Sequence, residues 1–519
     1  MGVELASSRV ANSIRNVFAA WGGQAISAVA SFVVRMVFVS CLAAEYVGLE
    51  TLFASVLTIL SLADLGIGSA IVFSLYNPLA KGDKELTKSL MRLFKRCYIS
   101  IGSIIIIVGL LVAPYISVIV GPDAPDIPYL ELYFFCFVLN TGVSYFFSYK
   151  GSLIMADQKN YIVYIIQYAF QILMSIAQIA VLLITGNYLL FLACMIASTV
   201  LQNIVIVYKA NKMYPYLKEK DVQPVDKEVL TAIKKNVLGL IMHKVAGVAS
   251  TPVSNLVITG FVGLAATSLY GNYLLVVNAL SRIVEKVFDS IIASVGNLGV
   301  TESEERQHEV FRATFFVNAF VYALACGGML CAFNPFITIW LGPEWCFPSY
   351  IVVCVVLLFY AKGMRCAGMA FTSAYGLYWY TKWKAVLEAV SLPILAVILV
   401  KPFGIAGVMI AGVISSVFIS TVYEAWAVYA HGFHGKLRTF VWSYLQYTAV
   451  TFASVGVAFM ICEALPVGGV LAFFVKGFIG VLIPFAAYAL FYHNSAEWKE
   501  IAGIIHRVIE KVRPHKSEA

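Results

Sequence analysis

Long apolar segments separated by short polar ones follow each other along the whole chain. Splitting the sequence at charged and turn-rich stretches leaves about 14 apolar segments, each long enough to cross a bilayer as a helix. The short alternating segments typical of a transmembrane β-barrel do not occur. The pattern therefore predicts an all-α polytopic membrane protein. The expected spans are 16–41, 47–75, 97–120, 129–152, 161–184, 188–208, 235–259, 266–292, 312–334, 348–371, 383–400, 405–429, 440–463 and 470–492.

Composition excludes a soluble core with a single membrane anchor. Of the 519 residues, 61% are hydrophobic and 12% are charged, whereas about 25% are charged in typical soluble domains. The ten cysteines are scattered, mostly inside apolar segments, and no two have C-x-x-C spacing. Because buried cysteine behaves as a small hydrophobic residue, we expect no metal site and no cofactor.

Basic residues in the loops predict the orientation of the chain. With the N-terminus in the cytoplasm and the spans alternating, every loop Lys and Arg except Lys401 faces the cytoplasm, in agreement with the positive-inside rule. Both termini are therefore expected to be cytoplasmic. In the tail 493–519, a cap-like Asn494 precedes an apolar stripe, which predicts a helix lying on the cytoplasmic interface. A partner-binding helix is the alternative.

A weak internal repeat suggests how the chain is divided. The stretch "LAAEYVGLETLF" leads into the second span and "LAATSLYGNYLL" leads into the eighth, six spans later. Because transporters are often built from such repeats, we expect two seven-helix lobes. The expected parts are an N-terminal lobe 1–208 with spans 1–6, a cytoplasmic linker 209–234, spans 7–14 in 235–492 with the second lobe mainly in spans 7–12, and the tail 493–519.

Seven basic residues fall inside the expected spans. If all seven faced lipid, the cost would be on the order of 20 kcal/mol on insertion scales, so some are expected to line a polar cavity. Those near inner helix ends could instead extend to the interface. Because they outnumber the embedded carboxylates and occur in both halves, they suit an anionic substrate. The seven are Arg35, Lys244, Arg282, Lys286, Lys362, Arg365 and Lys476.

Two polar stripes indicate which side chains could bind substrate. Arg35 shares a face of the first span with Gln24, and Lys244 shares a face of the seventh span with Asn255. The alternative is hydrogen bonding between helices through small polar residues. That alternative explains Arg35 poorly, because arginine keeps its charge. We expect these four residues to line the substrate cavity.

The stretch "NALSRIVEKVFDSI" places Arg282, Glu285, Lys286 and Asp289 on one helical face. We expect Arg282 and Lys286 to bind an anion whose hold the two carboxylates moderate. The alternative is a solvated extension of the helix beyond the membrane. Glu285 and Asp289, together with Asp64 of the second span, are also candidates for coupling to a cation. For Asp64, a role in helix packing and capping is an equal alternative.

Several stretches resemble the bacterial polysaccharide-export (Wzx-like) flippases of the multidrug/oligosaccharidyl-lipid/polysaccharide (MOP) exporter superfamily. The resemblance implies two seven-helix lobes around a central cavity that opens alternately to each side of the membrane. It also implies that Arg35, Lys244, Arg282 and Lys286 meet a diphosphate or acidic sugars. The stretches are "RMVFVSCLAAEYVGLETLFASVLTILSLADLGIGSAIVFSLYNPLAKGDKE", "ADQKNYIV", "SLYGNYLLVVNAL", "ASVGNLGV", "NPFITIWLG" and "KPFGIAGV".

The function implied by this resemblance is translocation of undecaprenyl-diphosphate-linked oligosaccharide repeat units across the bacterial cytoplasmic membrane for cell-surface polysaccharide biosynthesis. Implied partners are the lipid-linked oligosaccharide and membrane lipids, with a polysaccharide polymerase or glycosyltransferases as further candidates and no nucleic acid. Two alternatives stay open, a cation-coupled multidrug exporter and a flippase for the lipid-linked peptidoglycan precursor. An enzyme is not expected, because the outer loops are short and no D-x-D motif occurs.

Overall fold

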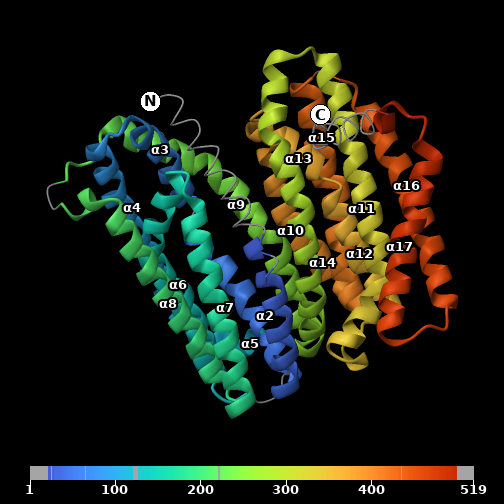
Figure 1. Cartoon of the computed structure of the whole chain (residues 1–519), viewed down its shortest axis with the longest axis horizontal. Helices are drawn as coiled ribbons and strands as arrows, with labels where there is room; N and C mark the ends of the chain where they lie inside the picture. Colours follow the sequence, from blue (N-terminus) through green and yellow to red (C-terminus); the bar gives the residue numbers. More distant parts are fainter. Residues whose placement is uncertain are drawn as a thin grey trace, which may run out of the picture. The chain divides into compact units, whose positions relative to one another are not determined.

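The computed structural model describes residues 22–499, except 25, 65, 121–126, 220–221 and 434. Within these residues the chain forms helices joined by short turns and contains no strand (Figure 1). The described part includes 11 helices that are long and apolar enough to cross a membrane. The prediction of an all-α polytopic membrane protein is therefore confirmed.

The helices follow one another in chain order after a first helix at Gly22–Cys41. The α-helices are α2 (Ala44–Leu60), α3 (Ile67–Lys81), α4 (Lys84–Val112), α5 (Ile116–Val120), α6 (Leu130–Ala156), α7 (Asn160–Thr185), α8 (Tyr188–Met213), α9 (Lys227–Phe261), α10 (Leu264–Thr301), α11 (Glu304–Trp340), α12 (Ser349–Gly363), α13 (Cys366–Ala374), α14 (Tyr378–Ile414), α15 (Val422–His431), α16 (Leu437–Ala464) and α17 (Gly469–Tyr492). The shorter elements are the 3₁₀ turns η1 (Ser61–Asp64), η2 (Ala113–Tyr115), η3 (Pro215–Lys218) and η4 (Pro343–Trp345) and the π-helix η5 (Ser415–Thr421).

Two expected spans are wrong as single continuous helices. Span 47–75 is broken between α2 and α3, where Gly66 adopts a left-handed conformation with φ 84° that glycine tolerates without strain. Span 348–371 is broken between α12 and α13, and Arg365 lies in the turn between them. Both breaks place a charged residue, Asp64 or Arg365, where the helical backbone is interrupted.

Contacts between residues divide the chain into two compact units, Met1–Gly271 and Asn272–Ala519. In the first unit, α4 and α6 approach closely at glycines. A Cβ at Gly102 would lie 2.7 Å from the carbonyl oxygen of Gly142. Small residues at such crossings are typical of helix packing in membranes, and they bring α4 and α6 together along much of their length.

The second unit is built around α11, which packs on α17 through a mutual glycine contact. A Cβ at Gly327 would lie 2.0 Å from the carbonyl oxygen of Gly480, and a Cβ at Gly480 would lie 2.3 Å from that of Gly327. The N-terminal half of α11 contributes buried aromatic rings, including Phe315 and Phe316, which pack on Tyr447 of α16. Backbone proximity on one side and ring packing on the other hold α11 in place.

Replacing Gly327 with alanine is expected to destabilise the protein by about 1–3 kcal/mol, because the added methyl group forces α11 and α17 apart. Thermal unfolding in detergent would measure the loss. Gly456→Ala on α16 is the matched control, since no atom lies within 4 Å of a Cβ built there. Equal stability of the two variants would contradict the close packing of α11 on α17.

The start of the predicted tail helix is fastened to α11. Ser495, rather than the predicted Asn494, provides the cap, because its Oγ accepts a hydrogen bond from the Trp498 N–H at 3.1 Å. Glu497 forms an ion pair with Arg312. The indole ring of Trp498 packs edge-on against the ring of Phe316. The rest of the predicted tail helix, residues 500–519, lies outside the described residues.

Candidate functional site

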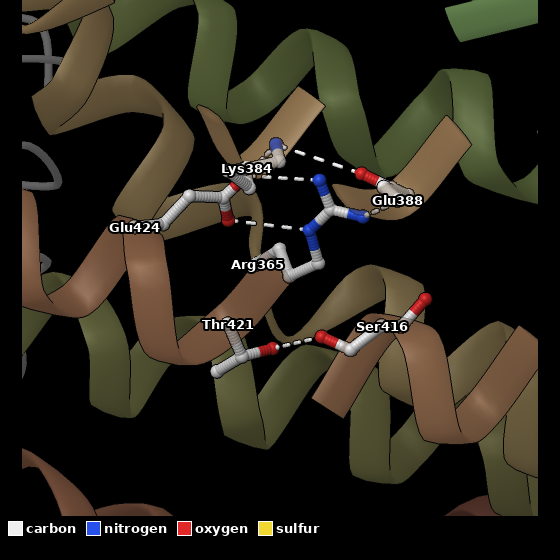
Figure 2. Close-up of polar contacts among 6 residues, drawn as sticks. All are labelled: Arg365, Lys384, Glu388, Ser416, Thr421 and Glu424. Atoms are coloured by element: carbon white, nitrogen blue, oxygen red, sulfur yellow. Dashed lines mark hydrogen bonds and ion pairs between the residues drawn. The ribbon is translucent and has the colours of Figure 1, made fainter. Parts of the chain in front are cut away.

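A buried network of charges joins α13, α14 and α15 of the second unit (Figure 2). At its centre, the Arg365 guanidinium donates from Nη2 to Glu424 Oε1 at 2.8 Å and from Nε to Glu424 Oε2 at 3.2 Å. Nη1 donates to Glu388 Oε1 at 3.3 Å. The side chains of Glu424 and Glu388 are only 4% and 9% exposed. Such two-point contacts are the strongest that arginine makes with carboxylates.

Lys384 completes the network from α14. Its Nζ lies 2.5 Å from Glu424 Oε1 and 3.9 Å from Glu388 Oε2. Lys384 and Glu388 are four residues apart, so they lie on one face of the helix. Two cations and two carboxylates therefore neutralise each other, which is the condition for burying charge at a tolerable cost.

A π-helix positions Glu424 in this network. The segment Ser415–Thr421 has π-helical geometry, and Glu424 follows it in the first turn of α15. Figure 2 shows the Thr421 Oγ1, which donates to the Ser416 carbonyl oxygen at 2.8 Å, beside the charged side chains. Short π-helical segments often occur at functional sites.

Segment 278–291 of α10 is linked to this network through Lys362. Glu285 interacts electrostatically with Lys362 at the end of α12. Lys362 also interacts with Arg365 and Glu388. Arg282 and Lys286 have exposed side chains on the same helix. The side chain of Asp289 lies outside the described part. Arg282, Glu285 and Lys286 are thus all exposed, and Glu285 is the one with an electrostatic interaction with α12.

The charges of this region divide into a balanced set and an excess. Lys362, Arg365 and Lys384 are opposed by Glu285, Glu388 and Glu424, so these six cancel. Arg282 and Lys286 add two positive charges, and Asp289 removes one of them by sequence alone. By sequence, these nine groups sum to one positive charge, and α10 itself carries two cations and two carboxylates.

In the first unit, Arg35 is paired with a carboxylate. Its Nη1 lies 3.1 Å from Glu50 Oε2 of α2, and its side chain is 15% exposed. The guanidinium carbon also lies 5.7 Å from the centre of the Phe38 ring. A paired arginine costs far less to bury than an isolated one. Arg35 is therefore part of an ion pair in this conformation, and its role in substrate binding stays a prediction.

The remaining predicted site residues lie on several elements of the first unit, and no contact between them is found among the described side chains. Asn255 is buried and donates from Nδ2 to Ser55 Oγ at 2.9 Å, a bond between α9 and α2. Gln24 is half-buried on the first helix. Asp64 is buried at the break after α2, where its Oδ1 accepts a hydrogen bond from the Gly68 N–H at 3.3 Å. Lys244 lies on α9, and its side chain is outside the described part.

Sequence reasoning missed the carboxylates Glu50, Glu388 and Glu424. Each lies inside an apolar segment of the sequence, far along the chain from the arginine that it contacts. The excess of embedded cations is consequently smaller than predicted, because Arg35 and Arg365 are both paired. One signal was available, since Lys384 and Glu388 have the i,i+4 spacing of a helical ion pair. In the described residues, no group of three His, Cys, Asp or Glu is arranged to hold a metal ion.

Comparison with known proteins identifies solved structures with a similar fold. No family model matches the sequence, and no curated protein matches it. Among solved structures, an inward-facing multidrug resistance MATE family transporter of the MOP superfamily matches with a TM-score of 0.62 and 14% identity, over 77% of this chain and 93% of its own. The lipid II flippase MurJ, in an inward closed conformation, matches with a TM-score of 0.62 and 14% identity, over 90% and 99%.

A MATE transporter of Vibrio cholerae, VcmN in its bent form, matches with a TM-score of 0.52 and 13% identity, over 82% of this chain and 98% of its own. These neighbours are transporters or a flippase by name, and at such low identity the likeness concerns the fold. The chain is a multi-pass membrane protein with the helical fold of MOP superfamily transporters.

Proposed function

We propose that this protein is a flippase that moves undecaprenyl-diphosphate-linked oligosaccharides across the bacterial cytoplasmic membrane, with both termini in the cytoplasm. The observation that carries the proposal is the exposed pair Arg282 and Lys286 on α10. They share α10 with Glu285, which interacts electrostatically with Lys362 of α12. The fold it shares with a lipid II flippase over 90% of the chain supports the same class of substrate.

In the proposed mechanism, the cations of α10 bind the diphosphate of the substrate. Charge-assisted hydrogen bonds from Arg282 and Lys286 would hold its oxygens, while the lipid tail stays in the bilayer. Glu285, between the two cations in sequence, would weaken the hold enough for release. Alternating access, in which transporter repeats rock around a fixed site, would then carry the head group to the other side.

The main rival is a multidrug exporter for cationic compounds. Such a substrate requires carboxylates that are available to it. In the described residues, however, Glu50, Glu388 and Glu424 each contact a cation of the protein itself. Their pairing disfavours the exporter. The lipid-linked peptidoglycan precursor carries the same diphosphate chemistry, so a direct comparison of substrates must separate it from an oligosaccharide lipid.

The test is translocation in liposomes that contain the purified protein. A fluorescent undecaprenyl-diphosphate oligosaccharide is placed in the inner leaflet, and its arrival outside is followed by quenching. We expect faster translocation than in protein-free liposomes, and faster than that of the peptidoglycan precursor. Transport of a cationic dye without translocation of either lipid would overturn the proposal in favour of a drug exporter. Preference for the peptidoglycan precursor would overturn the oligosaccharide assignment.

A further inference from the structure

A surface groove lies among α4, α6 and α8 of the first unit, and none of the residues assigned above lines it. Its volume is about 410 Å³, and its lining is mostly apolar. All three helices belong to segments apolar enough to span a membrane. The lining residues are Lys95, Ile99, Phe146, Phe147, Tyr149 and Val207.

One lysine lines this groove and a second follows a lining residue, and within the described residues neither forms an ion pair with a carboxylate. Lys95 is exposed and forms part of the lining. Lys150, one residue after the lining residue Tyr149, is 8% exposed and donates from Nζ to Asn211 Oδ1 at 3.0 Å. Its ammonium group also lies 5.7 Å from the Tyr149 ring centre. The charges of Lys95 and Lys150 are close enough to repel each other.

The surrounding helices offer little negative charge to offset this repulsion. The carboxylates of α4, α6 and α8 are Glu85 and Glu131 alone. Glu85 is paired with Lys88 at 2.7 Å, and Glu131 is in the first turn of α6, at the opposite end from Lys150. The basic residues of the same helices are Lys84, Lys88, Arg92, Lys95, Arg96, Lys150, Lys209 and Lys212.

We propose that this groove binds an anionic phospholipid of the membrane, with the phosphate between Lys95 and Lys150 and an acyl chain along Ile99, Phe146 and Val207. A buried or half-buried cation is costly when no opposite charge accompanies it, and a phosphate supplies that charge. The apolar walls favour a lipid over a soluble phosphate, because only a lipid covers them. Basic pockets between membrane helices bind lipid head groups on the same physical basis.

The experiment measures lipid binding to the full-length protein in detergent by native mass spectrometry. Dioleoylphosphatidylglycerol and dioleoylphosphatidylcholine are titrated separately, since they share acyl chains and differ in net charge. We expect tighter binding of the anionic lipid, and about a fivefold loss of that affinity in Lys95→Ala, the loss typical of removing one basic residue near a membrane surface. Lys95→Arg should retain the affinity.

A second variant tests the apolar half of the site without touching its charge. Ile99→Trp fills the groove and should also lower the affinity for phosphatidylglycerol, whereas Lys401→Ala, a charge removal on α14, should leave it unchanged. Equal binding of the two lipids by the wild type would overturn the proposal. So would undiminished phosphatidylglycerol binding in both Lys95→Ala and Ile99→Trp, or full competition by soluble glycerol phosphate. None of these outcomes depends on the transport activity proposed above.

Discussion

Replacing Arg365 with alanine is expected to lower the free energy of unfolding by about 3–5 kcal/mol, the usual cost of breaking a buried ion pair from one side. Arg365 contacts both Glu388 and Glu424, whose side chains are nearly inaccessible. After its removal, the two buried carboxylates would keep only Lys384 of the two cations that contact them now. Denaturant or thermal unfolding in detergent would report the loss as a lower midpoint.

Two further variants separate charge from bulk in this experiment. Arg438→Ala removes an exposed arginine of α16 and should change stability by less than about 0.5 kcal/mol. Adding Glu388→Gln to Arg365→Ala removes one uncompensated charge and should restore part of the stability. If Arg365→Ala unfolds like Arg438→Ala, the network does not contribute to the stability of the fold.

Removing both exposed cations of α10 should abolish most of the translocation. Each charge-assisted hydrogen bond contributes about 1.5–3 kcal/mol, so Arg282→Ala combined with Lys286→Ala should lower the translocation rate by at least on the order of 100-fold. Because both side chains are exposed, the fold should tolerate the change. The measurement is the initial rate of lipid-linked oligosaccharide translocation in liposomes at equal protein content.

The control for this double variant removes a carboxylate from the same helix. Glu285→Gln should bind the substrate more tightly than the wild type and release it more slowly, because it takes away the charge that opposes the diphosphate. The double variant should instead bind it more weakly. Unfolding midpoints of all variants show whether a loss of rate reflects misfolding. A double variant that folds and transports at the wild-type rate would remove Arg282 and Lys286 from the substrate path, even if the protein is a flippase.

The long apolar segments made the fold class predictable. Helix breaks and helix ends were less predictable, because they depend on the local backbone conformation. Spans such as 161–184 and 440–463 fall within single helices, α7 and α16, because nothing interrupts their apolar runs. The break at Gly66 depends on one backbone conformation, and hydropathy does not report it. Similarly, the cap at Ser495 differs from the predicted Asn494 by one residue, which is within the usual uncertainty of helix ends.

The charged site was harder to predict, because its members are distant in the sequence. Arg365 meets Glu424 across 59 residues and Glu388 across 23. Helical periodicity relates only residues a few positions apart, so the most it could have indicated here is that Lys384 and Glu388 lie on one face. Arg282 and Lys286 were found by periodicity because both lie on one helix. Which charges neutralise one another follows from packing between helices.

The π-helix before α15 determines the direction in which every later side chain of that helix points. One residue of an α-helix corresponds to a rotation of about 100°. Deleting a single residue from Ser415–Thr421 would therefore turn α15 by roughly that angle and carry Glu424 away from the Arg365 guanidinium. The wider π-helical turn rotates the helix that follows it. This rotation aligns Glu424 with Arg365, which lies 59 positions earlier in the chain.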